Sequence, residues 1–314
     1  MKQLSYILTF SLFLGSCAAP NSAEERQAES PVQFTAERTP FSGEFNQYWY
    51  AGKAELNSYE LEQARYGEIH RGHAVLIFVT EDFSASKQVK LDYPGGAGED
   101  KVPIMKLNFT KKFNTGIYPY SLMSSVFTPV DLKQNPHTLK TSMSGQEWCG
   151  HVFQQLNLRK DHYQSRGYSY FESEGDLEEK LPKVLLEDEL WTRIRLQPSD
   201  LPQGEVKLVP GSFYTRLRHK PSDPQSAELS LTEADGIATY TIKYPDSGRS
   251  LSIQFQASFP HQILGWEETL RSGYGASARP LTTKARLKKS LRAPYWSQNN
   301  VADLPLREAL GLPQ

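Results

Sequence analysis

The sequence predicts a mainly β protein: an antiparallel curved sheet, open barrel or sandwich, with one amphipathic helix at about 182–195 and a short C-terminal helix. Three observations predict this class. Long stretches alternate apolar and polar residues, which is typical of strands with one buried face. Fifteen Phe, 16 Tyr and 5 Trp residues are spread along such stretches. Two segments have the apolar spacing and the end residues of helices.

The early part of the body predicts a meander of strands. Within residues 64–83, apolar and polar side chains alternate as far as Arg71-Gly72, and a β-branched run, 74–80, follows. Two such runs around a two-residue loop with Gly predict a hairpin that turns at Arg71-Gly72. The same alternation predicts further strands on either side of this hairpin, within 48–59, 87–93 and 102–113.

The late part of the body predicts a second hairpin, within residues 236–260. Alternation places one set of residues of its first strand on the same face: Ala238, Tyr240, Ile242 and Tyr244. The other face carries Ile237, Thr239, Thr241 and Lys243. Residues 245–248 (PDSG) predict the turn, and the alternation resumes at Leu251, Ile253, Phe255 and Ala257.

Two helices are predicted between and after these strands. Residues 181–196 have apolar side chains at helical spacing with Pro182 at the start, so we expect a helix that packs on the sheet or plugs its mouth. Residues 303–311 have Pro in the first turn and Gly at the end, which predicts a short helix. If the body (41–314) divides, the boundary is expected near 198–204.

The first residues have the pattern of an export signal. Met1-Lys2 supplies one positive charge, and residues 4–14 are mostly apolar, which is too short for a bilayer-spanning helix of about 20 residues. The run ends Leu14-Gly15-Ser16-Cys17, which resembles the lipobox of bacterial lipoproteins. The resemblance implies that residues 1–16 are a signal peptide, removed before Cys17, and that Cys17 is the lipid attachment site, acylated with chains such as palmitate. An ordinary signal peptide with a chance cysteine is the alternative.

Residues 17–40 follow as a predicted lipidated flexible tether, because few large apolar residues occur there to offset the entropy of ordering. Two or three acyl chains would hold the protein at a membrane, since each buried methylene contributes about 0.8 kcal/mol. Residue 18 is Ala rather than the Asp that retains some lipoproteins at the inner membrane. We therefore expect an outer-membrane lipid anchor with the body in the periplasm, although surface exposure remains open.

The charge balance favours no polyanionic partner. The chain has 35 Lys and Arg against 36 Asp and Glu, a net charge of −1, so no nucleic acid partner is expected. The basic run 284–292 could meet lipid phosphates or anionic glycans, or form a solvated face that pairs with the acidic run 172–179. We therefore expect the membrane, through the anchor, and a lipid, glycan or envelope protein as partners.

The segment "QEWCGH" contains the residues best suited to take part in catalysis. If Cys17 is acylated, Cys149 has no intrachain partner and stays a free thiol. In a strand, Glu147, Cys149 and His151 would share one face, and a thiolate beside an imidazolium is an activated nucleophile. These three are the candidate catalytic residues. The competing interpretation is a cysteine packed in the core or in a ligand pocket with Trp148.

His70 and His73 flank the predicted Arg71-Gly72 turn, where two imidazoles would lie close enough to share a metal. A structural zinc site needs four ligands, and neither a Cys pair nor a third His lies nearby in sequence, so a solvent-exposed hairpin tip is the simpler interpretation. The sequence has no nucleotide, P-loop, zinc-protease or nucleophile-elbow motif. We expect no cofactor.

Five strings in combination resemble an uncharacterised family of Gram-negative envelope lipoproteins: "YWYAGKAELNSYELEQARYGE", "HAVLIFVTEDFS", "KFNTGIYPYSLM", "QEWCGH" and "YWSQNN". Members are sometimes labelled septum formation inhibitor Maf, but the Ser-x-Ser-x-Arg-Arg signature of Maf nucleotide pyrophosphatases is absent. The resemblance implies an envelope location and no particular reaction. The leading interpretation is a non-catalytic lipoprotein that binds an apolar or amphiphilic ligand or an envelope partner. A Cys/His-dependent envelope enzyme and a septum-associated factor are the alternatives.

Overall fold

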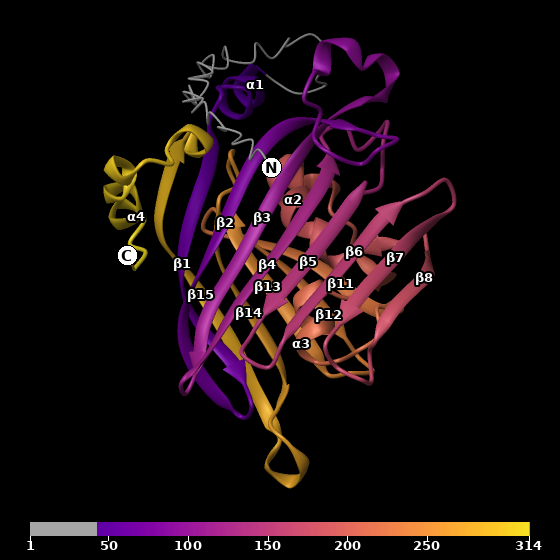
Figure 1. Ribbon diagram of the computed structural model, residues 1–314, viewed down its shortest axis with the longest axis vertical. Helices are drawn as coiled ribbons and strands as arrows, with labels where there is room; N and C mark the ends of the chain where they lie inside the picture. The colour runs from indigo at the N-terminus through magenta and orange to yellow at the C-terminus, as the bar shows by residue number, and fades with distance from the viewer. Residues whose placement is uncertain (1–42, 314) are drawn as a thin grey trace, which may run out of the picture. The chain divides into compact units, whose positions relative to one another are not determined.

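One large sheet forms the body of the protein (Figure 1). The computed structural model describes residues 43–313. Fifteen strands hydrogen-bond in the order β8-β7-β6-β5-β4-β3-β2-β1-β15-β14-β13-β12-β11-β10-β9. Every neighbouring pair is antiparallel except β9 and β10, which are parallel. The fold class predicted from the sequence is confirmed: one mainly antiparallel, curved sheet that does not close into a barrel.

The strands of the first half are β1 (Ala54–Arg65), β2 (Glu68–Ser84), β3 (Lys101–Thr115), β4 (Tyr118–Pro129), β5 (Lys140–Gln146), β6 (His151–Leu158), β7 (His162–Ser169) and β8 (Asp176–Pro182). Those of the second half are β9 (Leu185–Leu186), β10 (Gly204–Val209), β11 (Gln225–Ala234), β12 (Ile237–Tyr244), β13 (Arg249–Gln256), β14 (Ile263–Ser272) and β15 (Arg279–Ala293). The helices are α1 (Gly43–Trp49), α2 (Glu187–Leu196), α3 (Ser212–Leu217) and α4 (Pro305–Ala309).

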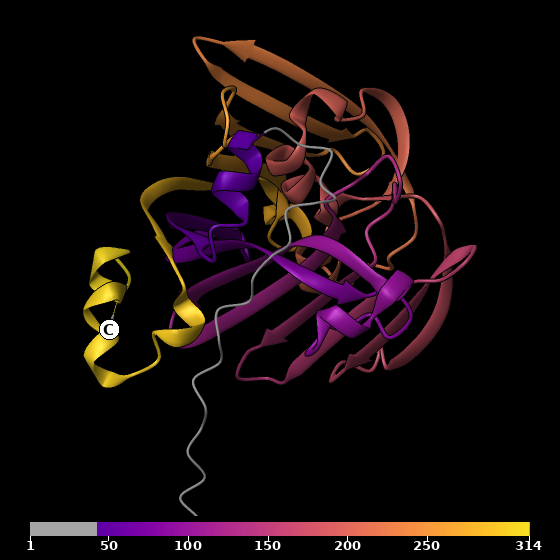
Figure 2. The same cartoon turned by 90° about the horizontal axis from the view of Figure 1, so that it is seen from above.

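The sheet curls until its two edges meet at one point. β8 and β9 are the opposite edge strands, yet only Lys183 and Val184 separate them in sequence. Leu181 and Leu186, one from each edge, belong to the same small apolar cluster. Seen from above, the strands curve around α2 (Figure 2). The concave side is therefore an interior, and α2 fills it.

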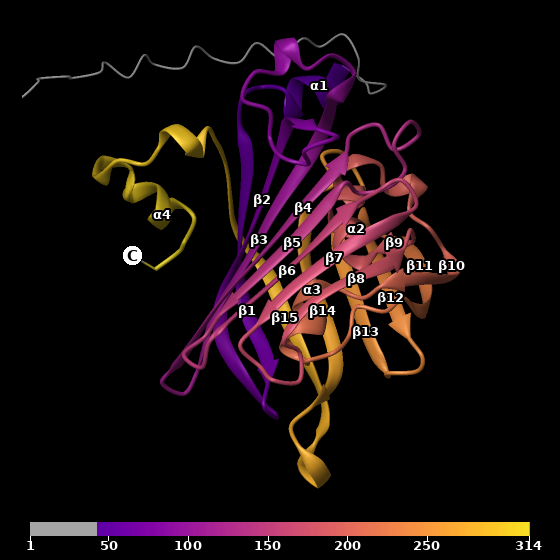
Figure 3. The same ribbon diagram turned by 45° about the vertical axis from the view of Figure 1, so that its right-hand side comes forward.

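Helices α2 and α3 lie between the two halves of the sheet (Figure 3). The main apolar core joins both halves to these helices, through residues such as Leu190, Trp191 and Phe213. The segment 198–204 connects α2 to β10, and the strands before and after it belong to the same sheet. The expectations for residues 1–16, for the tether 17–40 and for Cys17 lie outside the described residues.

The prediction of a turn at Arg71-Gly72 is wrong. The chain turns at Tyr66-Gly67, and β2 runs without interruption through Gly72. Tyr66 and Gly67 have φ of +53° and +86°, as the tightest two-residue hairpin loops require. Gly72 has a different reason to be Gly: a Cβ there would come within 2.2 Å of the Lys112 carbonyl oxygen.

Three further expectations differ from the structure. Residues 87–93 form no strand, since only Lys90 makes an isolated bridge, to Phe83. The central helix begins at Glu187 rather than near 182, because Asp176–Pro182 pairs with β7 and Leu185–Leu186 with β10. Residues 48–53 are not strand, since α1 extends to Trp49 and β1 begins at Ala54.

The late hairpin and the C-terminal helix are confirmed. Ala238, Tyr240, Ile242 and Tyr244 are buried, whereas Ile237 and Lys243 on the other face are exposed. The chain turns within residues 245–248, and Leu251, Ile253 and Phe255 are buried. The C-terminal helix α4 is shorter than the predicted 303–311 and follows a 3₁₀ turn.

Replacing Gly72 with Ala tests the close contact between β2 and β3. The new methyl group meets backbone, which cannot rotate away, so we expect the free energy of unfolding to fall by about 1–3 kcal/mol. Urea unfolding measures this change. Gly95→Ala is the matched control, because no atom lies within 4 Å of its Cβ position. Equal stability of the two variants would show that the strands separate easily at Gly72.

Candidate functional site

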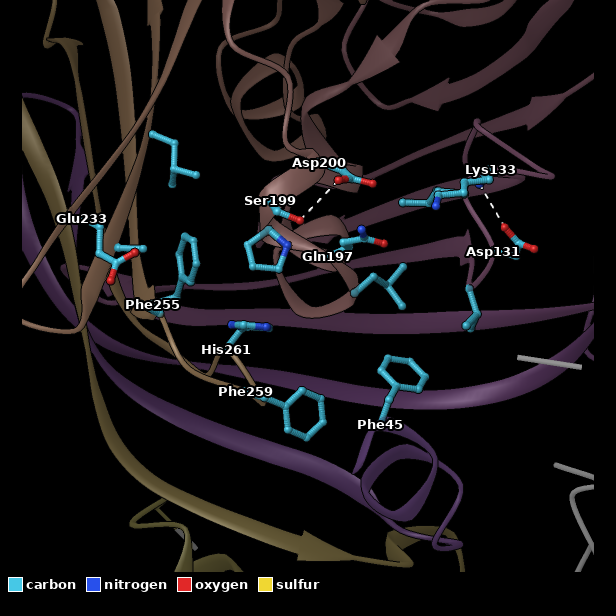
Figure 4. A pocket seen from close by; sticks show the side chains of 17 residues that line it. Phe45, Asp131, Lys133, Gln197, Ser199, Asp200, Glu233, Phe255, Phe259 and His261 are labelled. Carbon is cyan, nitrogen blue, oxygen red and sulfur yellow. Dashed lines mark hydrogen bonds between the residues drawn. The ribbon is translucent and has the colours of Figure 1, made fainter. Parts of the chain in front are cut away.

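The main opening into the interior is a cleft of about 550 Å³ at one end of the sheet (Figure 4). Four parts of the chain form it: α1, the loop after β4, the segment that follows α2, and the strands and loops from β11 to β14. These parts are distant in sequence and meet here because the sheet curls around α2. The volume lies within the range of about 300–1,000 Å³ that is typical of ligand sites.

One side of the cleft is apolar and partly aromatic. Phe255 is fully buried, and Phe45 and Phe259 lie opposite α2 with their ring centroids 6.4 Å apart. Leu196, the last residue of α2, closes the cleft on the inner side. The cleft therefore offers a wall suited to a hydrocarbon or an aromatic group.

The other side is a polar rim formed by Asp131, Lys133, Ser199, Asp200 and Glu233. An Asp131 side-chain oxygen accepts a hydrogen bond from the Lys133 backbone N–H at 3.0 Å, and the Ser199 hydroxyl donates to Asp200 at 3.3 Å. Among the described residues, none of the three rim carboxylates forms a salt bridge. The rim therefore keeps hydrogen-bonding capacity for a polar group.

His261 stands between the aromatic wall and the rim. Burial lowers the pKa of its imidazole, and the nearby Arg195 lowers it further. A hydrogen bond with the Gln256 carbonyl oxygen has the opposite effect on this pKa, which is smaller than that of burial. The ring is therefore neutral at neutral pH. It extends the aromatic wall and adds one hydrogen-bonding nitrogen.

Behind the cleft, α2 is held by ion pairs that are excluded from water. At its C-terminal end Arg195 donates two hydrogen bonds to Glu55 of β1, at 2.6 and 2.7 Å. At its N-terminal end Glu187 accepts two hydrogen bonds from Arg249 of β13, both at 2.6 Å, and Arg249 also pairs with Glu268 at 2.7 Å. All five side chains are at least 89% buried. Both ends of the helix are thus fixed to the sheet.

The pKa values of the two helix-pinning carboxyls reflect this pairing. Burial would raise the pKa of Glu55, but Arg195 and hydrogen bonds from Tyr48 and Asn57 hold it below its usual range. Burial would likewise raise the pKa of Glu187, and Arg249 together with the Tyr244 hydroxyl lowers it. Both carboxyls stay ionised, so the pairs persist at neutral pH.

The structure separates the three candidate catalytic residues. Residues 147–150 form the turn between β5 and β6, closed by hydrogen bonds of 3.1 and 3.2 Å between Glu147 and Gly150. The shared strand face predicted for Glu147, Cys149 and His151 therefore does not exist. Cys149 is exposed, and its backbone N–H donates to the Tyr118 hydroxyl at 3.1 Å. His151 is exposed on β6, and no described contact joins it to Cys149.

Glu147 and Cys149 do meet at Tyr118. Burial raises the pKa of the Tyr118 hydroxyl, and hydrogen bonds with the Cys149 thiol and the Glu147 carboxylate raise it further. The phenol therefore stays protonated. It positions the turn and cannot act as a base at neutral pH.

His70 and His73 both lie within β2, three residues apart, so their side chains leave opposite faces of the sheet. They were expected to share a metal because they would flank a turn at Arg71-Gly72. The chain does not turn there, so the two imidazoles are not brought together. Within residues 43–313, no group of three or more His, Cys, Asp or Glu side chains could hold a metal ion.

The sequence matches no known protein-family model and no curated protein, and the structure matches no solved structure. None of the described helices is long and apolar enough to cross a membrane. The cleft itself therefore carries the functional argument.

Sequence reasoning missed the ion pairs, although one signal was present. Glu187, Trp191 and Arg195 are spaced by four residues, so the charged residues share the face of the buried Trp. Charges on the apolar face of a helix indicate buried partners. The identity of the partners, Glu55 and Arg249, could not be read from spacing because they lie on distant strands.

Replacing Arg195 with Met tests whether the pairs hold α2. The substitution leaves Glu55 charged and unpaired in the interior, so we expect the free energy of unfolding to fall by about 3–5 kcal/mol. Urea unfolding at pH 7 measures it. In the double variant Glu55→Gln/Arg195→Met, we expect a loss smaller than the sum of the two single losses.

The exposed pair Lys284–Glu267, with an N···O distance of 3.3 Å, provides the control. Lys284→Met removes a surface charge, and we expect a change below about 1 kcal/mol. If Arg195→Met cost no more than this control, the interior pair would not be what fixes the helix.

Proposed function

We propose that this protein is an envelope lipoprotein, anchored in the outer membrane through Cys17, whose body binds an amphiphilic ligand in the cleft without catalysing a reaction. The observation that carries the binding proposal is the cleft of about 550 Å³, which has an aromatic wall and an opposite polar rim whose carboxylates form no ion pair with any described residue. The lipobox resemblance at Leu14-Gly15-Ser16-Cys17 supports the anchor.

The division of the lining favours an amphiphile over a purely polar ligand. Phe259 and Leu231 are only partly buried and offer carbon surface, whose contact with a hydrocarbon contributes about 25 cal/mol per Å² removed from water. Asp200 and Glu233 are exposed at the rim, where a polar group keeps contact with solvent. A molecule with one apolar and one polar end satisfies both sides.

The enzyme alternative rests on one observation, the exposed thiol of Cys149 beside Tyr118 and Glu147. No described imidazole contacts the thiol, since His151 lies apart on β6. The non-catalytic proposal is therefore the better supported one. Full complementation by Cys149→Ser would agree with the non-catalytic proposal, whereas loss of complementation would favour the Cys149-dependent enzyme.

Filling the cleft tests the binding proposal. We expect a fluorescent amphiphile, 11-(dansylamino)undecanoic acid below its micelle concentration, to bind the purified chain, as seen by a blue shift and increase of dansyl emission. Ala257 lines the cleft, so Ala257→Trp occupies space that the probe needs. We expect the affinity to fall at least tenfold.

Ala234→Trp is the matched control, because Ala234 is exposed on β11 outside the lining. It should leave the affinity within twofold of the wild type. Thermal unfolding of both variants separates blocked binding from lost folding. Binding that is equal in the two variants, or absent in the wild type, would contradict the proposal.

The anchor is tested separately in a Gram-negative host that expresses the full chain. We expect the mature protein to begin at residue 17, to incorporate labelled palmitate and to fractionate with the outer membrane. Cys17→Ser should abolish labelling and membrane association. An unmodified Cys17 with residues 1–16 still attached in a cytosolic pool would overturn the anchor.

A further inference from the structure

Lys111 of β3 is a buried residue whose amine has no hydrogen-bond or ion-pair partner among the described residues. Its side chain is 96% buried, and it is the one described lysine in the buried class. The Nζ atom lies 5.0, 5.3 and 5.9 Å from the ring centroids of Phe213, Phe109 and Trp266. Within residues 43–313, Nζ has neither a hydrogen-bond acceptor nor a carboxylate at ion-pair distance.

The two most deeply buried cations differ from Lys111. Arg195 and Arg249 each donate two hydrogen bonds to a carboxylate. Taking an ammonium out of water without such a partner is unfavourable, so the surroundings of Lys111 favour the neutral amine. Burial lowers its pKa, and Arg249 lowers it further, against Glu268, Glu187 and Asp188, which raise it.

Two small cavities reach the amine. They have volumes of about 30 and 20 Å³, and Lys111, Phe213, Tyr214 and Glu268 line both. The residues Phe213 and Tyr214 belong to α3, which covers the amine. Since one water needs about 10–15 Å³ measured in this way, the larger cavity has room for two or three heavy atoms.

The larger cavity also contains an acid. Asp188, near the start of α2, lines it and accepts hydrogen bonds from the Ser212 backbone N–H at 3.1 and 3.2 Å. Burial raises the pKa of Asp188 to about 6, and the adjacent Glu187 adds to the rise against the Ser212 bonds. An amine whose neutral form is favoured by burial and a carboxyl with a raised pKa thus line the same space, where the amine can attack a carbonyl group and the carboxyl can supply a proton.

We infer that Lys111 is a carbonyl-binding residue that forms an imine with an aldehyde of one or two carbons, assisted by Asp188. The site is separate from the cleft and does not depend on the proposed ligand. The cavity volume sets the size limit of the aldehyde.

The chemistry balances without a further reactant. The Nζ lone pair attacks the carbonyl carbon, a C–N bond forms, and a proton moves from nitrogen to the former carbonyl oxygen. The Asp188 carboxyl then protonates the hydroxyl group, which leaves as water while the nitrogen lone pair forms the C=N bond. The iminium returns its proton to the Asp188 carboxylate. The net change is amine plus aldehyde to imine plus one water.

The test uses the full chain, acetaldehyde and sodium cyanoborohydride at pH 7, where the reductant converts an imine to a stable ethylamine. Chymotryptic peptide mapping measures the rate at each lysine. We expect Lys111 to be ethylated at least tenfold faster than the exposed Lys133 and Lys207. Lys111→Met should remove the fast reaction, and Asp188→Asn, which keeps the acceptor for Ser212, should slow it at least tenfold.

A larger aldehyde is the control for the cavity. Benzaldehyde at the same concentration should label exposed lysines without preference for Lys111, because the cavity excludes it. If Lys111 of the wild-type protein were ethylated no faster than the exposed lysines, the inference would be overturned. This outcome does not depend on whether the variants fold. An unchanged rate in Asp188→Asn would remove the role of the acid.

Discussion

The fold depends on charge pairing inside a space that water does not enter. Helix α2 brings Glu187 and Arg195 into the interior of the sheet, and the sheet provides Arg249 and Glu55 to meet them. An unpaired charge at either end would cost several kcal/mol, a large part of the stability of a typical domain. The pairs also join the helix to β1 and to the consecutive strands β13 and β14, which are remote from β1 in sequence. The helix therefore fixes the curvature of the sheet as well as filling its interior.

The incomplete closure of the sheet follows from this packing. A closed barrel keeps a constant distance between facing strands, whereas here α2 separates the two halves and the edges meet only near Leu181 and Leu186. Beyond the end of the helix, at Leu196, nothing of equal width continues to fill the space. The cleft opens at that end. The cleft is thus a consequence of the length of α2 relative to the strands around it.

The sequence was sufficient to predict the fold class and the strands with a regular apolar and polar alternation. Alternation over 237–256 predicted both the strands and the buried face, because one face of that hairpin is buried and the other is solvated. Alternation failed as a guide in the strands whose two faces are both covered. β1 is buried at ten of its twelve residues, since the C-terminal segment with Leu310 packs on its outer side, and the alternation loses its meaning there. Gly72 looked like a turn residue but is required by a close strand, which only the register of β3 reveals.

The functional residues were harder to predict because they are defined by contacts across the sheet. The cleft combines residues from 45 to 261, and the partners of Lys111 come from β3, α2, α3 and β14. No local motif contains such a set. The candidates that a local motif did suggest, Glu147, Cys149 and His151, are held apart because a turn, rather than a strand, links them.

The interior is divided by α2 into two chemically different compartments. Ten residues give the helix a length of about 15 Å, with the Phe-lined cleft at the end of Leu196 and the larger of the two small cavities at the end of Glu187 and Asp188. The first is open and offers carbon surface, so it suits reversible binding by desolvation. The second is far smaller and holds an amine whose charge is unfavourable there, so it suits a small reagent that changes that charge. Because the ion pairs pin both ends of the helix, each compartment keeps its shape without help from the other.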